Sequence, residues 1–478
     1  MNAPILRLFG VFLVLFGALV AFTSWNSVIN AEEYRDSTLN ARSLIEEQRI
    51  RRGLIRARDE TLLARSQRLE GEAGIYERRY TAEAELFSHA IGYNYLRIGR
   101  AGLERSRNEA LVGERNALTS IFDELRGERQ DGDNVITNLD PDAQRVALQA
   151  LQGRKGSVVA IEPDTGKVRV MASVPGYDPA ALDDPDTFRR LSTDDENSPL
   201  VNRATQSGYP PGSTFKVVTA AAALDSGEYT PTSTVDGDSP KEISGVPLEN
   251  FGQQDFGPTT LTTALTNSVN TVWAQVAEDL GPGVLDEYMR RFGLYEDPPI
   301  DYPDGQLFPS GVYQDGELVP ADGGIDIGRV AIGQGNLLVT PLQMAMVAAT
   351  VANGGELMQP QLTDRIVDRD GRTVEDVEPE RATRVMSEES ASQLTAMMGN
   401  VVREGTGTAA ALSGIDVAGK TGTAEINLQG LNQPWFIGFA PQGSPEVAVA
   451  VTIERVQGGQ GGVVAAPIAK QVMQELTG

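Results

Sequence analysis

A serine and a lysine three residues apart form the first candidate reactive pair. The stretch "PPGSTFKVV" (210–218) places Ser213 after Pro210, Pro211 and Gly212, with Lys216 at the i+3 position. If Ser213 begins a helix, both side chains lie on one face, about a turn apart. A serine hydroxyl needs an adjacent base, and lysine can serve only when burial or a nearby positive charge lowers its pKa. The pair predicts a lysine-activated serine, and the alternative is an exposed helix start with an incidental lysine.

Composition removes most other catalytic groups. The chain has six lysines, no cysteine and a single histidine, His89. Thiol nucleophiles and cysteine metal sites are therefore impossible, and a Ser-His-Asp triad would depend on His89 alone. We expect His89 to be structural. A covalent mechanism would need a Ser or Thr nucleophile with Lys, Asp or Glu as its base.

Two later stretches offer partners for Ser213 and Lys216. "TNSVNTVW" contains Ser268 and Asn270, and "AGKTGTAE" contains Lys420, Thr421, Gly422 and Thr423. A lysine on a strand can reach into a cleft, and Gly422 allows another backbone to approach that strand closely. Either stretch alone carries little weight, since Ser24 and Asn26 share the Ser-x-Asn spacing and a glycine-interrupted edge strand explains the other.

In this order, the SxxK, SxN and KTG motifs resemble those of the penicillin-recognising serine transferases and hydrolases. Further stretches resemble class B penicillin-binding proteins: "TNLDPDAQRVALQAL", "GSVVAIEPDTGKVRVMASVPGYDP", "AIGQGNLLVTPLQMAMVAATVANGG" and "PWFIGFAP". The similarity covers nearly the whole chain after the N-terminal apolar segment. Among these proteins, the chain most resembles the short actinobacterial kind, which has a small N-terminal pedestal. Val269 stands where the class A β-lactamase motif carries aspartate.

The resemblance implies a D,D-transpeptidase that cross-links peptidoglycan stem peptides ending in D-Ala-D-Ala. It makes Ser213 the nucleophile, Lys216 its base and Ser268 a proton relay, with Asn270 holding the acyl side-chain amide. Lys420, Thr421 and Thr423 would bind the terminal carboxylate, and the N–H groups of Ser213 and Thr423 would form the oxyanion hole. Gly422 and Trp435 complete the predicted substrate-binding set, although an aromatic residue on a strand is more often buried in the core. β-Lactams are expected to acylate Ser213, and the resemblance implies that no metal or organic cofactor is required.

Three other functions remain open at this point. A β-lactamase or carboxypeptidase would hand the acyl group to water, for which "DSPKEISGVPLEN" offers carboxylates. A scaffold of the cell-wall machinery would have an inactive site, against which three intact motifs argue. A β-lactam-sensing receptor would need further transmembrane segments or an intracellular domain, and only seven residues precede the apolar segment.

The elements that position these residues can be read from apolar patterning. Residues 156–173, 434–441 and 446–454 are expected to form strands, and residues 215–227, 340–355 and 466–478 to form helices. They predict an α+β fold, of the penicillin-recognising serine transpeptidase type, with helices packed on an antiparallel sheet. Residues 151–478 are the predicted transpeptidase domain, and residues 31–150 a smaller, non-catalytic pedestal of helices and short strands with a dimerisation-like character.

The N-terminus predicts export. Residues 8–29 carry no charge and are long enough to cross a bilayer, with Arg7 before them and Glu32 after. We favour an uncleaved single-pass anchor over a signal peptide, with residues 1–7 cytoplasmic and the catalytic domain outside the cell membrane.

Charge and size bear on the partners. The net charge of −25 argues against nucleic-acid binding. The pedestal is too short for a glycosyltransferase, so the resemblance implies a SEDS-type glycan polymerase and other membrane division or elongation proteins as partners. The sequence does not distinguish division, elongation and sporulation roles, nor the third stem-peptide residue, the β-lactam spectrum or the oligomeric state.

Overall fold

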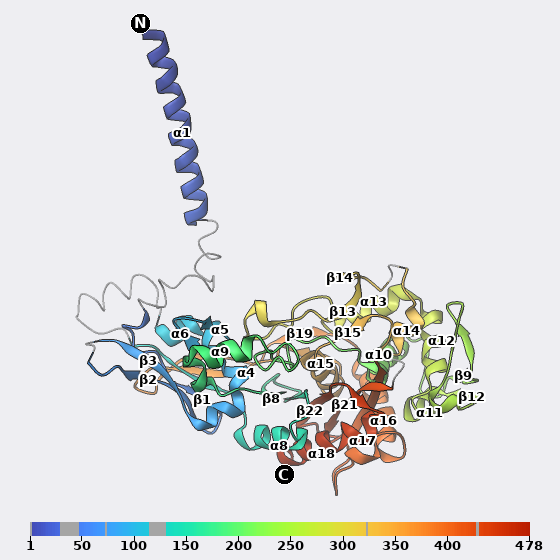
Figure 1. Cartoon of the computed structure of the whole chain (residues 1–478). Coiled ribbons are helices and arrows are strands. Elements are labelled where there is room, and N and C mark those ends of the chain that lie inside the picture. Colours follow the sequence, from blue (N-terminus) through green and yellow to red (C-terminus); the bar gives the residue numbers. More distant parts are fainter. Residues whose placement is uncertain (1, 29–46, 72–73, 114–130, 322–323, 427–429) are drawn as a thin grey trace.

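The computed structural model describes residues 2–28, 47–71, 74–113, 131–321, 324–426 and 430–478 (Figure 1). Helix α1 (Asn2–Val28) stands apart from the rest of the molecule. Its segment Arg7–Trp25 has a mean hydropathy of 2.2 and is wholly unburied, and its length and composition suit a membrane span. The helix is therefore a candidate membrane anchor. Ile29, at the end of the predicted span, and the pedestal residues 31–46 and 114–130 lie outside the described residues.

A wholly antiparallel sheet forms the centre of the larger part of the molecule. Its strand order is β20-β21-β22-β7-β8, and β23 also pairs with β21. The bounds are β20 (Ala418–Glu425), β21 (Leu431–Ala440), β22 (Val447–Ile453), β23 (Val456–Gln457), β7 (Gly156–Ile161) and β8 (Val168–Val174). The β7–β8 hairpin thus joins strands from the opposite end of the chain, and β20 is left at the edge of this sheet.

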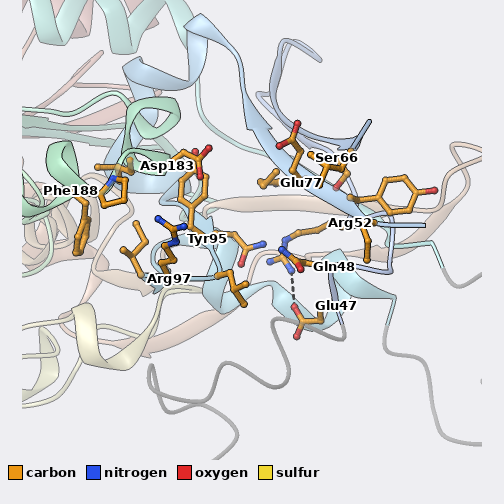
Figure 2. Close-up of a pocket in the computed structure, with 18 of the residues that line it drawn as sticks. Glu47, Gln48, Arg52, Ser66, Glu77, Tyr95, Arg97, Asp183 and Phe188 are labelled. Carbon is orange, nitrogen blue, oxygen red and sulfur yellow. Dashed lines mark ion pairs between the residues drawn. The ribbon is translucent and has the colours of Figure 1, made fainter. Parts of the chain in front are cut away.

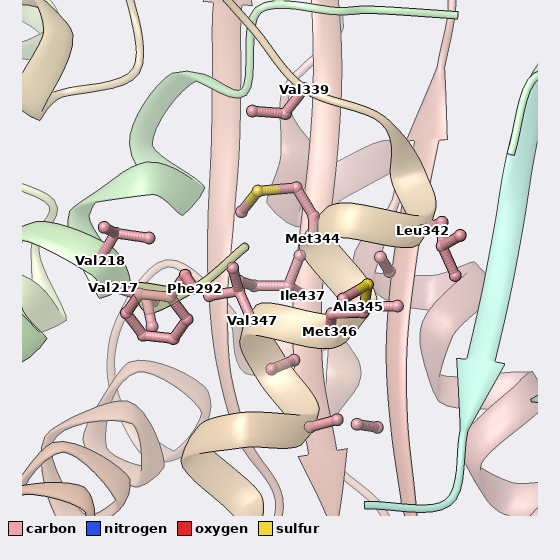
Figure 3. Packing of buried hydrophobic residues seen from close by; sticks show 14 of the residues in the cluster. Val217, Val218, Phe292, Val339, Leu342, Met344, Ala345, Met346, Val347 and Ile437 are labelled. Carbon is pink, nitrogen blue, oxygen red and sulfur yellow. The ribbon is translucent and has the colours of Figure 1, made fainter. Parts of the chain in front are cut away.

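Helices cover both faces of this sheet. Because side chains alternate along a strand, Phe436 and Ile437 of β21 belong to different buried clusters. Ile437 faces α15 (Pro341–Ala352), as Figure 3 shows, while Phe436 shares its cluster with residues of α8 (Pro141–Leu151) and α18 (Ala466–Leu476). The helices and strands that the sequence predicted here are confirmed, and so is the α+β fold.

A second sheet forms the centre of the pedestal, in the order β18-β17-β6-β1-β2-β3. Its strands are β18 (Thr373–Asp376), β17 (Thr363–Val367), β6 (Asn134–Thr137), β1 (Ile55–Arg56), β2 (Leu62–Arg68) and β3 (Tyr76–Tyr80). Two of them, β17 and β18, follow α15 in the sequence, and α8 packs against β8 and α18 rather than against this sheet. Contacts between the two parts are therefore extensive, and the division of the chain at residue 150 stays a prediction.

The remaining elements are short or surround the two sheets. The other helices are η1 (Ala82–Phe87), α4 (Ser88–Ile91), α5 (Leu103–Ser106), α6 (Asn108–Val112), η2 (Pro179–Asp183), α9 (Pro185–Ser192), η3 (Gly212–Phe215), α10 (Lys216–Asp225), η4 (Phe251–Gln253), α11 (Leu261–Thr266), α12 (Asn270–Leu280), α13 (Pro282–Arg291), η5 (Asp304–Gln306), α14 (Ile327–Ala331), α16 (Glu388–Arg403), η6 (Thr408–Ala410) and α17 (Gly461–Val464). The other strands are β4 (Asn94–Tyr95), β5 (Gly99–Arg100), β9 (Thr234–Asp236), β10 (Lys241–Ile243), β11 (Val246–Leu248), β12 (Pro258–Thr260), β13 (Gly311–Gln314), β14 (Glu317–Val319), β15 (Leu337–Leu338), β16 (Glu356–Met358) and β19 (Arg381–Arg384).

A buried ion cluster stabilises the pedestal. The carboxylate of Glu104 is fully buried and accepts hydrogen bonds from Nε of Arg52 at 2.7 Å and from Nε of Arg78 at 2.5 Å. Burial alone would raise the pKa of Glu104, but the two guanidinium groups together hold that pKa below its ordinary value. Arg52 and Arg78 also line a cavity of about 730 Å³, where Arg52 lies 3.6 Å from a carboxylate oxygen of Glu47 (Figure 2).

Replacing Glu104 with glutamine should destabilise the pedestal strongly, because it removes the carboxylate that two buried guanidinium groups share and leaves Arg52 only its longer contact with Glu47. We expect a loss of about 3 kcal/mol or more in the free energy of unfolding. The measurement is thermal and urea unfolding of the full chain in detergent. Glu83→Gln is the matched control, since Glu83 pairs with Arg145 at the surface and should change stability by less than about 1 kcal/mol. Equal effects of the two substitutions would contradict the assigned role of Glu104.

Candidate active site

Ser213 lies in a tight turn of helix that leads directly into a longer one. It belongs to the 3₁₀ helix η3, and Lys216 is the first residue of α10. Gly212 begins η3 with φ of 53°, a left-handed conformation that glycine adopts without steric cost. Ser213 is partly exposed whereas Lys216 is fully buried. The structure therefore places a partly exposed hydroxyl at Ser213 and a buried amine at Lys216, about a turn further along.

Ser268 lies between the two buried lysines. It occupies the short connection between α11 and α12, with φ of 60°, which is uncommon for a residue other than glycine. Its Oγ lies 3.3 Å from Nζ of Lys216 and 2.9 Å from Nζ of Lys420. One hydroxyl thus contacts both amines, and a proton could pass along this line from one group to the next.

The amine of Lys216 is held by hydrogen bonds to the segment that carries Ser268 and Asn270. Its Nζ donates to the carbonyl oxygen of Ser268 at 2.8 Å and to Oδ1 of Asn270 at 2.7 Å. Burial, and then the nearby charge of Lys420, lower the pKa of Lys216 well below its ordinary value. Within the described part of the chain no hydrogen bond joins Lys216 to Oγ of Ser213; catalytic hydrogen bonds are often long before a ligand binds.

Lys420 extends from β20 into the same site. Its side chain is fully buried, and its Nζ also donates to the carbonyl oxygen of Thr421 at 3.0 Å. Burial lowers the pKa of Lys420 to about 7. Lys420 therefore retains part of its charge near neutral pH, and that charge in turn disfavours protonation of Lys216.

The free edge of β20 faces the site. Ile426 N donates to Leu431 O, so residues 426 and 431 form a hydrogen-bonded pair of the β20–β21 ladder. Hydrogen-bonded and non-hydrogen-bonded pairs alternate along the ladder. Thr423, three residues before Ile426, therefore belongs to a non-hydrogen-bonded pair, and its N–H and C=O point away from β21. Its partner across the ladder is Pro434, which has no N–H to offer. The edge can therefore donate one N–H toward Ser213 and can pair with an added strand.

Gly422 is required because η3 lies against β20. A Cβ atom at Gly422 would lie 2.6 Å from the carbonyl oxygen of Pro211 and 3.1 Å from the backbone nitrogen of Thr214. Gly333 makes the corresponding approach from the other side, since its Cβ would lie 1.9 Å from the carbonyl oxygen of Gly212. Two glycines thus let backbone touch backbone on both sides of the turn that carries Ser213. This confirms the close approach predicted for Gly422.

The remaining predicted residues fall into two groups. Thr421 and Thr423 border the site: the hydroxyl of Thr421 lies 2.6 Å from that of Thr406, and the hydroxyl of Thr423 accepts from Gly461 N at 3.1 Å. Asn270 donates to the carbonyl oxygen of Glu249 at 3.0 Å while it accepts from Lys216. The side chain of Asn270 is therefore already engaged on both of its polar atoms.

Trp435 does not line the site, contrary to the prediction that it binds substrate. It is fully buried, and its Nε1 donates to the carbonyl oxygen of Pro210 at 2.9 Å. Its ring meets that of Tyr209 edge to face, with centroids 6.2 Å apart. The physical reason is its face on β21, which points into the core beneath the loop before Ser213. Trp435 therefore supports that loop instead of contacting a ligand.

A charged contact behind this loop had no signal in the sequence. Oε1 of Glu454 accepts from Nε of Arg203 at 2.7 Å and from the hydroxyl of Tyr209 at 2.6 Å. Arg203 and Glu454 are 251 residues apart, so only the fold brings them together. The Gly-Gln-Gly turn that contains Gly333 can be recognised in the sequence, whereas nothing in the sequence indicates that Thr406 contacts the site.

His89 is buried in the pedestal, away from the site. One ring nitrogen lies 2.9 Å from the carbonyl oxygen of Pro199, and burial lowers the pKa of His89 to about 4. It is therefore neutral at physiological pH, which agrees with the structural role predicted for it.

The assembled groups suit acyl transfer to and from a serine. Ser213 is accessible, the two lysines and Ser268 can move its proton, and the N–H of Thr423 can stabilise an oxyanion. Among the described residues no group of three or more His, Asp and Glu side chains is placed to hold a metal ion.

Comparison with known proteins gives the same result for nearly the whole chain. Residues 156–474 match the penicillin binding protein transpeptidase domain, and residues 52–135 match the penicillin binding protein A dimerisation domain. The peptidoglycan D,D-transpeptidase PbpA of Mycolicibacterium smegmatis is 35% identical over 98% of both chains. PbpA of Mycobacterium tuberculosis is 34% identical over 99% of both chains. The structure of penicillin-binding protein A from M. tuberculosis as a penicillin G acyl-enzyme complex is 33% identical, with a TM-score of 0.79 over 90% of this chain and all of that one.

Substituting Gly422 with alanine should disable the site without unfolding the protein. The added methyl group would push the turn carrying Ser213 away from β20, and a displacement of about 1 Å can cost about 100-fold in rate. The measurement is the second-order rate constant for acylation of Ser213 by benzylpenicillin. Gly443→Ala is the matched control, because nothing lies within 4 Å of a Cβ at that exposed glycine. An unchanged rate in Gly422→Ala would mean that the η3–β20 contact does not set the geometry.

Proposed function

The chain belongs to the penicillin-binding protein transpeptidases, of the class B type, and from this premise we propose that it cross-links peptidoglycan stem peptides ending in D-Ala-D-Ala. The observation that carries the proposal is the line Lys216–Ser268–Lys420 beside an accessible Ser213, with distances of 3.3 and 2.9 Å from the Ser268 hydroxyl to the two amines. It supplies a base, a relay and a cation at one nucleophile.

The acylation step follows from these positions. Ser213 Oγ attacks the carbonyl carbon of the penultimate D-Ala while neutral Lys216 accepts its proton. The N–H groups of Ser213 and Thr423 stabilise the oxyanion. The C–N bond to the terminal D-Ala then breaks, and Ser268 passes a proton to the leaving nitrogen. An amine of a neighbouring stem peptide attacks the ester in the second step and releases Ser213.

Substrate positioning rests on β20. The donor peptide would pair with the free edge of this strand, as extended peptides do when they add to an exposed sheet edge. Lys420, with the hydroxyls of Thr421 and Thr423, would bind the terminal carboxylate. Gly422 allows η3, which carries Ser213, to lie close to β20. Asn270 would exchange its contact with Lys216 for the amide of the acyl chain.

The contacts of the site favour transfer to an amine over transfer to water. A hydrolase of this chemistry needs a second base for a water molecule. Within the described residues, the groups that hydrogen-bond the side chains of Lys216 and Ser268 are lysine, hydroxyl, amide and carbonyl groups, and none is a carboxylate. β-Lactams would then leave a slowly hydrolysed ester on Ser213.

The cellular setting forms part of the proposal. We infer that α1 is a single-pass anchor with residues 1–7 in the cytoplasm, because Arg7 precedes the span and positive charge stays on the cytoplasmic side. Residues 31–150 would serve as the non-catalytic pedestal and residues 151–478 as the transpeptidase domain, outside the membrane. A SEDS-type polymerase, contacting α1 and the pedestal, would supply the glycan strands.

Intact-mass spectrometry of the full chain with benzylpenicillin tests the reaction. We expect one adduct of the full drug mass that persists for many minutes and is absent in Ser213→Ala. A short-lived adduct with rapid drug loss would indicate a hydrolase instead. Folded protein with no adduct would favour the inactive scaffold.

The pH dependence of acylation tests the roles of the two lysines. Since burial and the charge of Lys420 lower the pKa of Lys216, the rate constant for benzylpenicillin acylation should rise with pH through a value well below 10.5. It should fall again above about pH 7, where Lys420 loses its charge and its attraction for the drug carboxylate. A rate that keeps rising to pH 10 would contradict both assignments.

A further inference from the structure

The hydroxyl of Thr421 in β20 contacts a loop that comes from a different part of the chain. Residues 404–407 connect α16 to η6, and Thr406 among them is exposed. The hydroxyl oxygen of Thr406 lies 2.6 Å from that of Thr421, which is buried. Among the described residues the hydroxyl of Thr421 has no other hydrogen-bond partner. Within this part of the chain, Thr406 is therefore the group that can fix the direction of the Thr421 hydroxyl.

Backbone contacts hold Thr406 in this place. Its backbone nitrogen donates to the carbonyl oxygen of Thr266, at the end of α11, at 3.3 Å. A Cβ atom at Gly405 would lie 2.4 Å from the same oxygen. A Cβ atom at Gly462 would lie 2.3 Å from the carbonyl oxygen of Thr406. Two glycines thus let other backbone pack closely around Thr406, so its backbone is fixed although its side chain is exposed.

The role of Thr421 determines which of the two hydroxyls is the donor. This step rests on the proposed function. A hydroxyl group donates one hydrogen bond and accepts up to two. When Thr421 donates its only proton to the terminal carboxylate, its bond with Thr406 must be one that it accepts. Thr406 is then the donor, and a hydroxyl that accepts a hydrogen bond becomes a stronger donor itself.

The hydroxyl of Thr423 has the same arrangement with a backbone donor. It accepts a hydrogen bond from Gly461 N at 3.1 Å. A backbone N–H can only donate, so the proton of the Thr423 hydroxyl stays free for a ligand. Gly461 cannot be varied to test this, since its Cβ would lie 2.2 Å from the carbonyl oxygen of Trp435. Thr406 occupies the corresponding place beside Thr421, and there the contact is made by a side chain that can be changed.

We propose that Thr406 is a positioning residue for carboxylate recognition. It donates its hydroxyl proton to Oγ1 of Thr421 and thereby directs the Thr421 proton toward the carboxylate of the donor peptide or of a β-lactam. Thr406 acts through Thr421 and not on the ligand. Without it, the Thr421 hydroxyl is free to rotate, and the ligand loses part of one charge-assisted hydrogen bond. The expected cost is about fivefold in the rate constant for acylation.

Benzylpenicillin and its methyl ester test this role, because the ester has the same reactive ring but no carboxylate charge. The measured quantity is the ratio of their second-order rate constants for acylation of Ser213, followed by intact-mass spectrometry of the full chain in detergent. We expect Thr406→Val to lower the ratio about fivefold. Thr406→Ser keeps the hydroxyl and should keep the original ratio. An unchanged ratio in Thr406→Val, including equal losses with both ligands, would overturn the proposal.

A double-substitution cycle tests whether Thr406 acts through Thr421. Once Thr421→Val has removed the shared hydroxyl, adding Thr406→Val should leave the ratio unchanged, because coupled residues are not additive. A full fivefold effect of Thr406→Val in the Thr421→Val background would show that Thr406 acts by another route.

Controls separate this proposal from the one on which it rests. Thr408→Val should keep the original ratio, since Thr408 is exposed and its side chain makes no hydrogen bond to the described residues. If Thr406→Val does not fold, Thr406→Ala removes the same hydroxyl without added bulk and should lower the ratio equally. Failure of benzylpenicillin to acylate Ser213 in the unaltered chain would overturn the proposed function instead.

Discussion

Two lysine side chains buried on either side of one serine hydroxyl impose the main constraint on this structure. Lys216 and Lys420 are both fully buried, and each contacts Oγ of Ser268. Burial penalises each ammonium group, and the charge of Lys420 further lowers the pKa of Lys216, so a state in which both lysines are protonated is disfavoured. The fold thereby obtains a neutral amine next to a serine without using histidine.

Such a pair works only if the surrounding backbone is fixed closely. Gly422 and Gly333 remove the methyl groups that would hold the turn of Ser213 away from its neighbours. Trp435 and Tyr209 fill the space beneath that turn, and Trp435 anchors it through the carbonyl oxygen of Pro210. Ser268 accepts a left-handed conformation, which is the kind of local cost that proteins tolerate at functional positions. In this part of the molecule, the close packing of the backbone therefore determines where the reactive side chains lie.

The sequence predicted the elements that have a clear apolar periodicity and the site residues that belong to recognisable motifs. The long apolar elements β21, β22, α10, α15 and α18 follow from their periodicity, and the residues of the site follow from motifs whose chemistry limits the residue types. Contacts between distant segments carried no such signal. Nothing local indicates that β17 joins β6 in the pedestal, or that Glu454 meets Arg203. Trp435 was misplaced because strand residues alternate between faces, and the sequence alone does not say which face borders a cleft.

Buried cations have two different roles in this protein, and one role uses arginine while the other uses lysine. The chain has six lysines against 35 arginines, and the pedestal buries Arg52 and Arg78 around Glu104. Arginine suits that cluster because it stays protonated and its planar group binds a carboxylate well. At the active site the same property would be harmful, since a permanently charged group cannot accept a proton from Ser213. A lysine with a lowered pKa and, among the described residues, no carboxylate partner can lose its proton there. The pairing of the cation, more than its burial, thus separates a structural ion cluster from a catalytic base in this fold.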